Sequence, residues 1–252
     1  MTPSSLLLTA LVACSPKDGP VAPLPAGQDL APAAAVFERY LRASTFENPE
    51  IMRSIQSNHM VMRLEIPAMG MNARAEMWWV APNQMLMETQ LDGLGTITQG
   101  YDGERGWMDD PTLGPRLLEG EELAQTRFQS EPYGDLDFNA RYSVLETVQQ
   151  TEQGGEPTWE VLAVPRAWST EIRYFFSTES GLLVASEQEV ASPMGKIRAT
   201  TRFSDYREAG GMLSPYRMEQ KVMGMSQVMT VELVEYNLAD LPTIAVPPEL
   251  AR

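Results

Sequence analysis

Only one histidine and one cysteine occur in this chain of 252 residues, and they limit the chemistry that it can perform. His59 falls on the polar side of an alternating segment, where an exposed or structural histidine is far commoner than a catalytic base. A Ser-His-Asp triad would need His59, and the nearest string to a nucleophile elbow, Gly224 to Val228, lacks the second glycine. The composition does not exclude a pair of carboxylates, such as Asp109 and Asp110, that act as general acid and general base. Adjacent acids on a turn are, however, usually just solvated. We therefore expect no enzyme.

Cofactor motifs are also missing from the sequence. A zinc site of histidine and cysteine is excluded, because there is a single histidine and Cys14 has another role, described next. The segment from Asp102 to Glu104 lacks the ligand spacing of an EF-hand calcium loop. The segment from Gly93 to Gly95 is a turn and no phosphate cradle, since neither a helix start nor a lysine follows it. We expect no metal and no cofactor.

Cys14 ends a short apolar run, Leu6 to Ala13, and is followed by the small residue Ser15. This run is too short to span a bilayer and is typical of the core of a signal peptide, which we assign to residues 1–14. The five residues before it carry no Lys or Arg, so we expect translation to begin further upstream. The alternative is a buried N-terminal strand or helix with an incidental cysteine.

The four residues Leu11-Val12-Ala13-Cys14 resemble the lipobox of bacterial lipoproteins. That resemblance implies that Cys14 is the lipidation site and carries several acyl chains of the palmitate type after cleavage, which would make membrane attachment permanent. Ser15 replaces the aspartate of the usual inner-membrane retention signal, which favours the periplasmic face of the outer membrane. Residues 15–32 are rich in proline and glycine, so we expect a tether that lets the following domain stand off the membrane.

The composition excludes several partners. A net charge of -15 makes nucleic acid an unlikely ligand, because binding to phosphates needs a basic patch. The same charge disfavours docking on anionic lipid head groups. Beyond Cys14, no apolar stretch approaches the length of a transmembrane helix. The remaining residues, 33–252, are enough for one sizeable core, and we predict a single domain.

Hydrophobic periodicity predicts a mainly β, α+β domain. From Ala33 to Leu41 the apolar residues follow helical spacing, and Asn48-Pro49 starts a second short helical turn. From about residue 55 the period changes to two, with strands predicted at about 59–66, 71–79, 85–91, 96–101, 106–109, 142–148, 158–164, 170–176, 182–190, 196–203 and 216–234, the last with a break near Gly224. Pro111, Gly114 and Pro115 interrupt the sheet pattern before a helix at Leu117 to Phe128.

These elements give about 10–11 strands with few helices. We predict a curved antiparallel sheet that forms an incomplete β-barrel, with the helices over its open side. A sandwich of two sheets is the alternative.

Methionine is unusually frequent, with 16 residues, and it concentrates on the apolar face of the predicted strands. Because methionine adapts to ligands of variable shape, this face could line a pocket for acyl chains. The simpler interpretation is that these side chains fill a core between sheet and helices. The candidate ligand-binding residues of the apolar cavity are Met60, Met62, Met71, Met77, Trp79, Met85, Met87, Met223 and Met225.

Three further segments carry a resemblance to a known family: GYDGERGWMDDPTLGPRLLEGEEL from Gly100 to Leu123, YFFSTESGLLV from Tyr174 to Val184, and PTIAVPPEL from Pro242 to Leu250. With the lipobox and the N-terminal helix, they resemble the outer-membrane lipoprotein-sorting proteins related to the carrier LolA and the receptor LolB. The resemblance implies an incomplete antiparallel barrel whose concave apolar face, lidded by helices, binds lipid or lipoprotein acyl chains.

Two functions therefore remain open. One is lipid binding of the lipoprotein-sorting type. The other is a non-catalytic structural or interaction lipoprotein of the envelope, with a solidly packed barrel and an envelope protein as partner.

Overall fold

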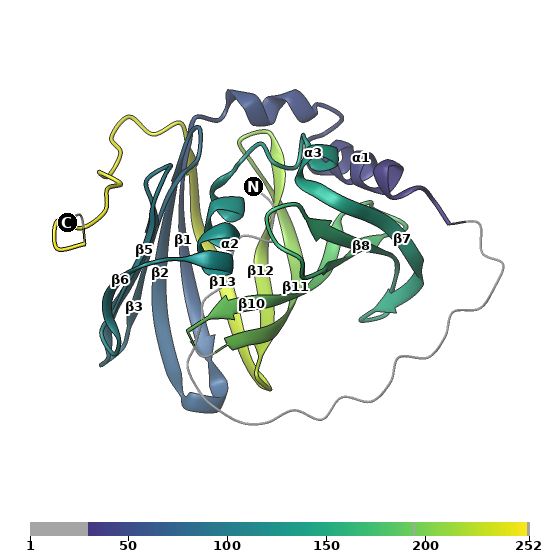
Figure 1. Cartoon of the computed structure of the whole chain (residues 1–252). Coiled ribbons are helices and arrows are strands. Elements are labelled where there is room, and N and C mark those ends of the chain that lie inside the picture. The colour runs from purple at the N-terminus through teal and green to yellow at the C-terminus, as the bar shows by residue number, and fades with distance from the viewer. Residues whose placement is uncertain (1–29, 194, 251–252) are drawn as a thin grey trace.

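The computed structural model describes residues 30–193 and 195–250, and these form one 13-stranded antiparallel sheet with helices on its concave side (Figure 1). The strands lie in the order β6-β5-β4-β3-β2-β1-β13-β12-β11-β10-β9-β8-β7. The sheet is strongly curved and is not closed into a barrel. The predicted incomplete barrel is confirmed, and the two-sheet alternative is wrong.

The N-terminal half of the sheet is a run of hairpins. It comprises β1 (Ser57–Ile66), β2 (Met71–Val80), β3 (Gln84–Leu91), β4 (Gly95–Tyr101), β5 (Gly106–Asp110) and β6 (Gly114–Leu117). The C-terminal half comprises β7 (Tyr142–Gln153), β8 (Glu156–Pro165), β9 (Ile172–Ser177), β10 (Leu183–Ser192), β11 (Gly195–Ala209), β12 (Met212–Val222) and β13 (Met225–Tyr236). Pairing of β1 with β13 joins the two halves.

The strand count differs from the prediction at two places. The predicted break near Gly224 is a full hairpin that separates β12 from β13. The segment that begins at Gly114 forms strand β6, although its proline and glycine residues were expected to end the sheet. Pro115 is tolerated there because β6 is an edge strand, where a backbone without an N–H costs no ladder hydrogen bond.

The helices close one end and the concave side of the sheet. Helix α1 (Ala33–Ser44) and the 3-10 turn η2 (Pro49–Ser54) confirm the predicted helical segments, and η3 (Pro67–Met69) lies in the β1–β2 turn. Helix α2 (Gly120–Ser130) and the single turn α3 (Phe138–Arg141) lie in the connection between the two halves of the sheet. None of the described helices is long and apolar enough to cross a membrane.

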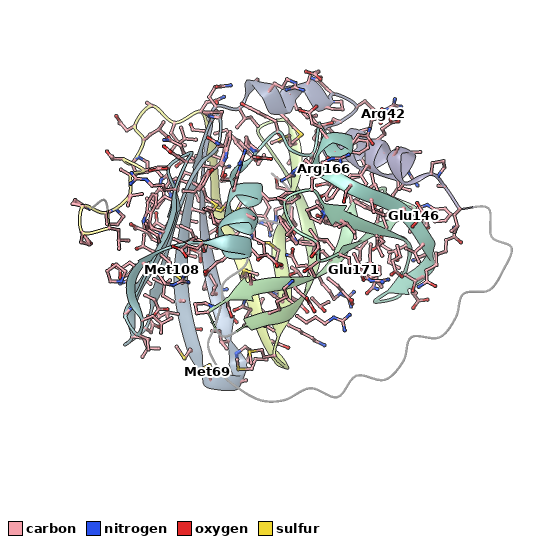
Figure 2. All side chains as sticks on the ribbon, viewed as in Figure 1. Arg42, Met69, Met108, Glu146, Arg166 and Glu171 are labelled. Carbon is pink, nitrogen blue, oxygen red and sulfur yellow. The ribbon has the colours of Figure 1, made fainter. Side chains whose placement is uncertain are left out.

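The core lies between the concave face and α1, where side chains fill the space (Figure 2). Phe37 of α1 is its centre, with ring centroids 5.0 to 6.0 Å from four aromatic rings: Phe138, Tyr142, Tyr174 and Phe176. Outside the sheet, Ile244 and Val246 of the C-terminal segment pack on Leu86 and Trp107. That segment therefore covers part of the convex face.

Candidate functional site

Most of the predicted cavity residues lie in the main core. Cross-strand pairs place Met60 beside Met77, and Met77 beside Met87, on the concave face. All members of this group are at most 7% exposed, and the group belongs to the cluster that contains α1: Met60, Met62, Met77, Trp79, Met85 and Met87. Met71, at the start of β2, is half-buried and is not among the buried members of this cluster. The predicted strand parity is therefore correct, and contact of these residues with a ligand stays a prediction.

Met223 and Met225 lie apart from the other predicted residues, and their contact with a ligand stays a prediction. Both lie at the β12–β13 hairpin, where Met223 packs on a separate small cluster of Val190, Ala199 and Val222. A buried polar layer separates the two clusters: the amide of Gln227 donates to Gln220, and that of Gln220 donates to Thr201 at 3.2 Å. Met225 lies on the same side of β13 as the buried Gln227 and Met229, whereas Met223 lies in the turn, and the sequence did not reveal the polar layer.

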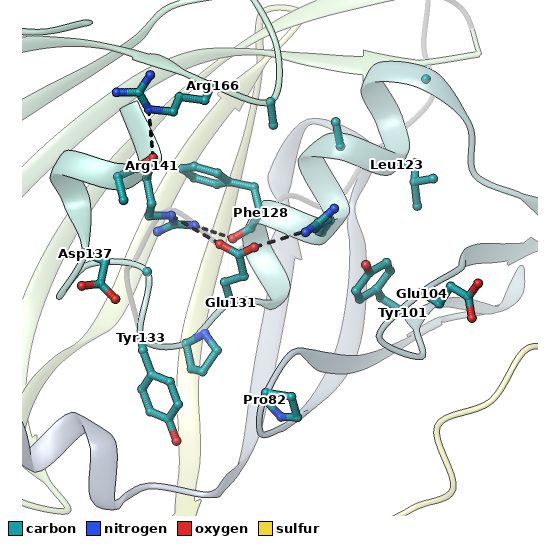
Figure 3. Close-up of a pocket in the computed structure, with 17 residues that line it drawn as sticks. Pro82, Tyr101, Glu104, Leu123, Phe128, Glu131, Tyr133, Asp137, Arg141 and Arg166 are labelled. Atoms are coloured by element: carbon teal, nitrogen blue, oxygen red, sulfur yellow. Dashed lines mark hydrogen bonds and ion pairs between the residues drawn. The ribbon is translucent and has the colours of Figure 1, made fainter. Parts of the chain in front are cut away.

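A groove of about 780 Å³ opens beside α2, between the β4–β5 turn and the connection from α2 to α3 (Figure 3). Its apolar walls come from Tyr101, Leu123, Ala124, Phe128 and Tyr133. Charged side chains stand around them: Glu104, Arg127, Glu131, Asp137, Arg141 and Arg166. This volume is in the range of small-molecule sites. None of the nine predicted cavity residues lines it.

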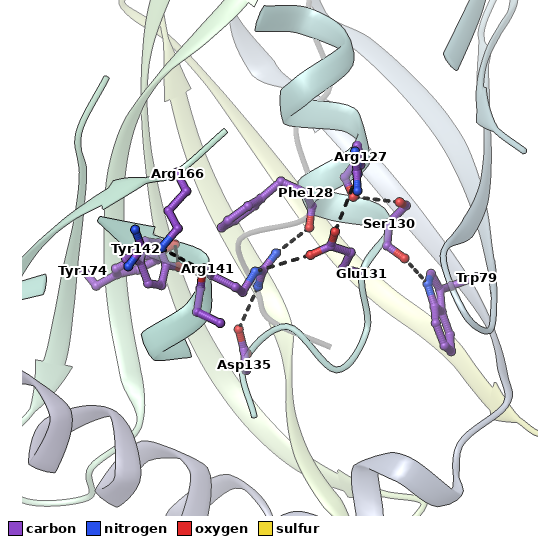
Figure 4. A network of polar contacts seen from close by, with 11 residues as sticks. Trp79, Arg127, Phe128, Ser130, Glu131, Asp135, Arg141, Tyr142, Arg166 and Tyr174 are labelled. Carbon is purple, nitrogen blue, oxygen red and sulfur yellow. Dashed lines mark hydrogen bonds and ion pairs between the residues drawn. The ribbon is translucent and has the colours of Figure 1, made fainter. Parts of the chain in front are cut away.

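Arg141 holds one wall of the groove together (Figure 4). Its guanidinium donates to the carbonyl of Phe128 at 2.5 Å and to Asp135 at 3.3 Å, and it lies 3.5 Å from the centre of the Phe128 ring. A longer ion pair of 3.8 Å joins it to Glu131. One buried side chain thus links the end of α2, the following loop and α3.

Asp135 is the buried partner of this arginine. Burial raises the pKa of Asp135, and the positive charge of Arg141 opposes that rise. The carboxylate is therefore tolerated only because the guanidinium is held beside it.

Two further contacts join this wall to the sheet. The indole N–H of Trp79 donates to the carbonyl of Ser130 at the end of α2. The hydroxyl of Tyr133 donates to the carbonyl of Ile55 at 2.9 Å, and its ring lies edge-on to Trp79 at 5.9 Å. Trp79, a predicted site residue, therefore lies behind the groove and supports it.

His59 lies on the opposite, convex face, as its parity predicted. Its Nε2 lies 3.0 Å from Glu76 and its Nδ1 3.4 Å from Glu235, and its ring stacks on Trp78 at 4.8 Å. Partial burial raises the pKa of Glu76, but hydrogen bonds from His59 and Arg74 outweigh it and hold the pKa below its usual value. Both ring nitrogens face carboxylates, so the histidine joins three strands.

Other sequence predictions fall elsewhere. Cys14 and the segment 15–29 lie outside the described residues. Within residues 30–193 and 195–250, no group of three or more His, Cys, Asp or Glu side chains could hold a metal ion. The groove residues were missed by sequence reasoning. Leu123 and Phe128 were recognised as helical, but nothing in the pattern indicated which helix face would be left uncovered.

Comparison with solved structures identifies the fold. A LolA superfamily protein from Nitrosomonas europaea superposes with a TM-score of 0.54 at 12% identity, covering 84% of this chain and 96% of that protein. The chain has the LolA-like fold. A DUF1329 family protein from Desulfovibrio piger gives a TM-score of 0.53 at 11% identity, with 84% and 96% covered. A lipoprotein-sorting domain from Vibrio parahaemolyticus gives 0.50 at 10% identity, with 79% and 94% covered.

At these low sequence identities, the superpositions show a shared fold, but not a shared ligand or function. No family profile and no curated protein matches this chain. The resemblance drawn from sequence segments is thus supported by architecture.

Proposed function

We propose that this LolA-like chain is an envelope lipoprotein that binds an acyl chain of a lipid or lipoprotein in the groove beside α2. The groove itself is the observation that carries the proposal. It is lined by both apolar and charged residues, in a volume of about 780 Å³. Such a site suits an apolar chain with a polar end. Its place in a fold shared with lipoprotein-sorting proteins supports the same ligand class.

Leu123→Glu is expected to weaken binding of a fluorescent fatty acid by about tenfold or more, since it removes one leucine contact and adds a charge to the wall. Titration of the purified chain with the probe measures this. Leu123 is only half-buried, so the variant should keep its fold. Gln129→Glu is the matched control, because Gln129 lies on the same helix, is also half-buried and does not line the groove. Equal probe affinity in both variants would contradict a site in this groove.

The membrane anchor is the second part of the proposal. We assign residues 1–14 to a lipoprotein signal peptide, residues 15–32 to a tether and residues 33–252 to the LolA-like domain. Cys14→Ser is expected to abolish acylation and to release the protein from the outer-membrane fraction, because the only cysteine is the only lipidation site. Metabolic labelling with a palmitate analogue and membrane fractionation measure both effects. A Cys14→Ser protein that still takes up label would refute the anchor.

A non-catalytic structural or interaction lipoprotein is the second candidate function. The dense packing of the methionine face favours it, since Met62 and Met77 are at most 1% exposed in the main core cluster. Mass spectrometry of an organic extract separates the two functions. Lipid that co-purifies with the chain, and is lost in Leu123→Glu, supports acyl-chain binding. A lipid-free extract together with no probe binding supports the packed barrel.

We propose no catalytic role for this chain. The single histidine is held between Glu76 and Glu235 on the convex face, away from the groove. The groove carries no histidine or cysteine among its lining residues.

A further inference from the structure

The hairpin turns at one end of the sheet share a dipeptide pattern, which has no part in the groove. In the β1–β2, β3–β4, β5–β6 and β12–β13 turns, a large apolar residue directly precedes a glycine: Met69-Gly70, Leu94-Gly95, Leu113-Gly114 and Met223-Gly224. Met194-Gly195 repeats the pattern in the β10–β11 turn, although Met194 itself lies outside the described residues. Gly70 and Gly114 have positive φ, so they allow the tight turns that leave the preceding side chain at the tip.

Strand register places these turns at the same end. Ile66 pairs with Met71 at the end of β1, and Leu91 pairs with Gly95 at the end of β3. Pairing of Ala73 with Leu91 aligns these two hairpins, and pairing of Glu65 with Val228 brings the β12–β13 turn to the same end. A Cβ on Gly95 would lie 3.1 Å from Pro111, so the β3–β4 and β5–β6 tips are adjacent. Figure 2 shows Met69 at this end, away from α1.

The tip side chains are open to solvent. Leu94 is 58% exposed, Leu113 is 53% and Met69 is 44%. A single exposed apolar residue is ordinary, but here they recur at successive hairpin tips of one end of the sheet. The opposite end of the same hairpins has different turns. There the chain turns through Pro82-Asn83, Asp102-Gly103-Glu104 and Gly210-Gly211. The two ends of the sheet therefore present different chemistry to solvent.

We propose that this end, the apolar tip surface of Met69, Leu94 and Leu113, inserts its side chains into the interfacial layer of a phospholipid bilayer. Successive hairpin tips are two strands apart, about 10 Å. Separate protruding side chains at this spacing make no continuous surface for a protein partner, but each can enter a lipid interface independently. The proposal goes beyond acyl-chain binding, since it needs neither the groove nor a bound chain.

The net charge of the protein indicates which lipid head groups the apolar tip surface can approach. The chain carries a net charge of -15, so an anionic membrane would repel it. At this end Lys196 is ion-paired with Glu121 at 2.9 Å, and the exposed Asp92 lies in the β3–β4 turn, so the tips offer no excess of positive charge to an anionic surface. Binding is therefore expected to depend on apolar insertion and to be strongest on zwitterionic lipid.

Flotation with vesicles of phosphatidylcholine and phosphatidylethanolamine tests the proposal, using the full chain with Cys14→Ser so that no anchor contributes. This protein should float with the vesicles, in low and high salt alike. Adding Met69→Glu, Leu94→Glu and Leu113→Glu should reduce the bound fraction by about tenfold or more. The matched control adds Phe46→Glu, Val144→Glu and Leu241→Glu, three apolar residues of similar exposure that lie elsewhere, and should bind like the parent.

Circular dichroism and a cooperative melt establish that each variant is folded. If the triple tip variant melts without cooperativity, Leu94→Glu and Leu113→Glu are tested singly. Equal losses in the tip and control variants would overturn the proposal, as would a parent chain that never floats. Sedimentation that shows a parent dimer, dissociated by the tip substitutions, would assign the surface to a second copy and also overturn it. Fatty-acid binding in solution should be unchanged in the tip variant, which separates this proposal from the groove.

Discussion

Met77→Glu is expected to abolish cooperative folding of the LolA-like domain. Met77 is 1% exposed on the central strand β2, between Met60 on β1 and Met87 on β3. Its two cross-strand neighbours, Met60 and Met87, cannot pair with a carboxylate. Burying an unpaired charge costs several kcal/mol, which is of the order of the whole stability of a domain. Urea denaturation followed by circular dichroism measures the loss.

Glu76→Met is the control, because Glu76 neighbours Met77 in sequence but lies on the convex face. It loses its contacts with His59 and Arg74 at a partly exposed site, so we expect a cost of about 1 kcal/mol or less. The comparison also tests the methionine face. A Met77→Glu protein that stays folded but no longer binds the fatty acid would show that this face is open to ligand. Unfolding supports a packed core.

Arg141→Met should destabilise the domain by about 3 to 5 kcal/mol, because Asp135 is left buried without its partner. The loss should depend on pH. Burial holds the pKa of Asp135 above its usual value, and removing Arg141 raises it further. A carboxyl whose pKa is higher in the folded state than in the unfolded state lowers the free energy of unfolding when it ionises. This loss of stability is therefore greatest above the folded-state pKa of Asp135, and it disappears as the pH falls to the pKa of the unfolded chain.

Urea titrations at several pH values between 7 and 4 measure this effect. The deficit of Arg141→Met relative to the parent should shrink as the pH is lowered. Adding Asp135→Asn removes the ionisable group and should leave a smaller deficit that no longer changes with pH. A deficit of equal size across the range in Arg141→Met alone would show that Asp135 is not the source.

The sheet could be predicted from the sequence because its signal is local. Alternation of Met60, Met62 and Leu64 with polar residues fixes both strand and face, and α1 follows from helical spacing. The same parity could not separate Met225 from Met77, because both lie on the concave side and only the length of the strands places a glutamine layer between them. Pro115 is tolerated because β6 is an edge strand, and that position depends on the tertiary pairing of the strands, which the local sequence does not indicate.

The groove lay beyond sequence reasoning for a similar reason. Its walls join α2 to the β4–β5 turn and to the β8–β9 connection, segments that only the folded sheet brings together. The anchoring pair of Asp135 and Arg141 joins a loop to a helix turn, with no motif to mark it. Periodicity indicates which side of an element is buried, but not where two elements leave a space between them.

The β1–β13 ladder has a consequence for how the chain folds. Each half of the sheet is a series of hairpins between consecutive strands, so its contacts form between nearby residues. The ladder that joins the halves pairs residues such as His59 and Glu235, which are 176 positions apart. Closing so long a loop is entropically costly and slow compared with hairpin formation. We therefore expect the two meanders to form first and their pairing along β1 and β13 to be the rate-limiting step. Until that step is complete, both strands present unpaired edges that other chains could pair with, so aggregation of the folding chain is expected to be most probable at this stage.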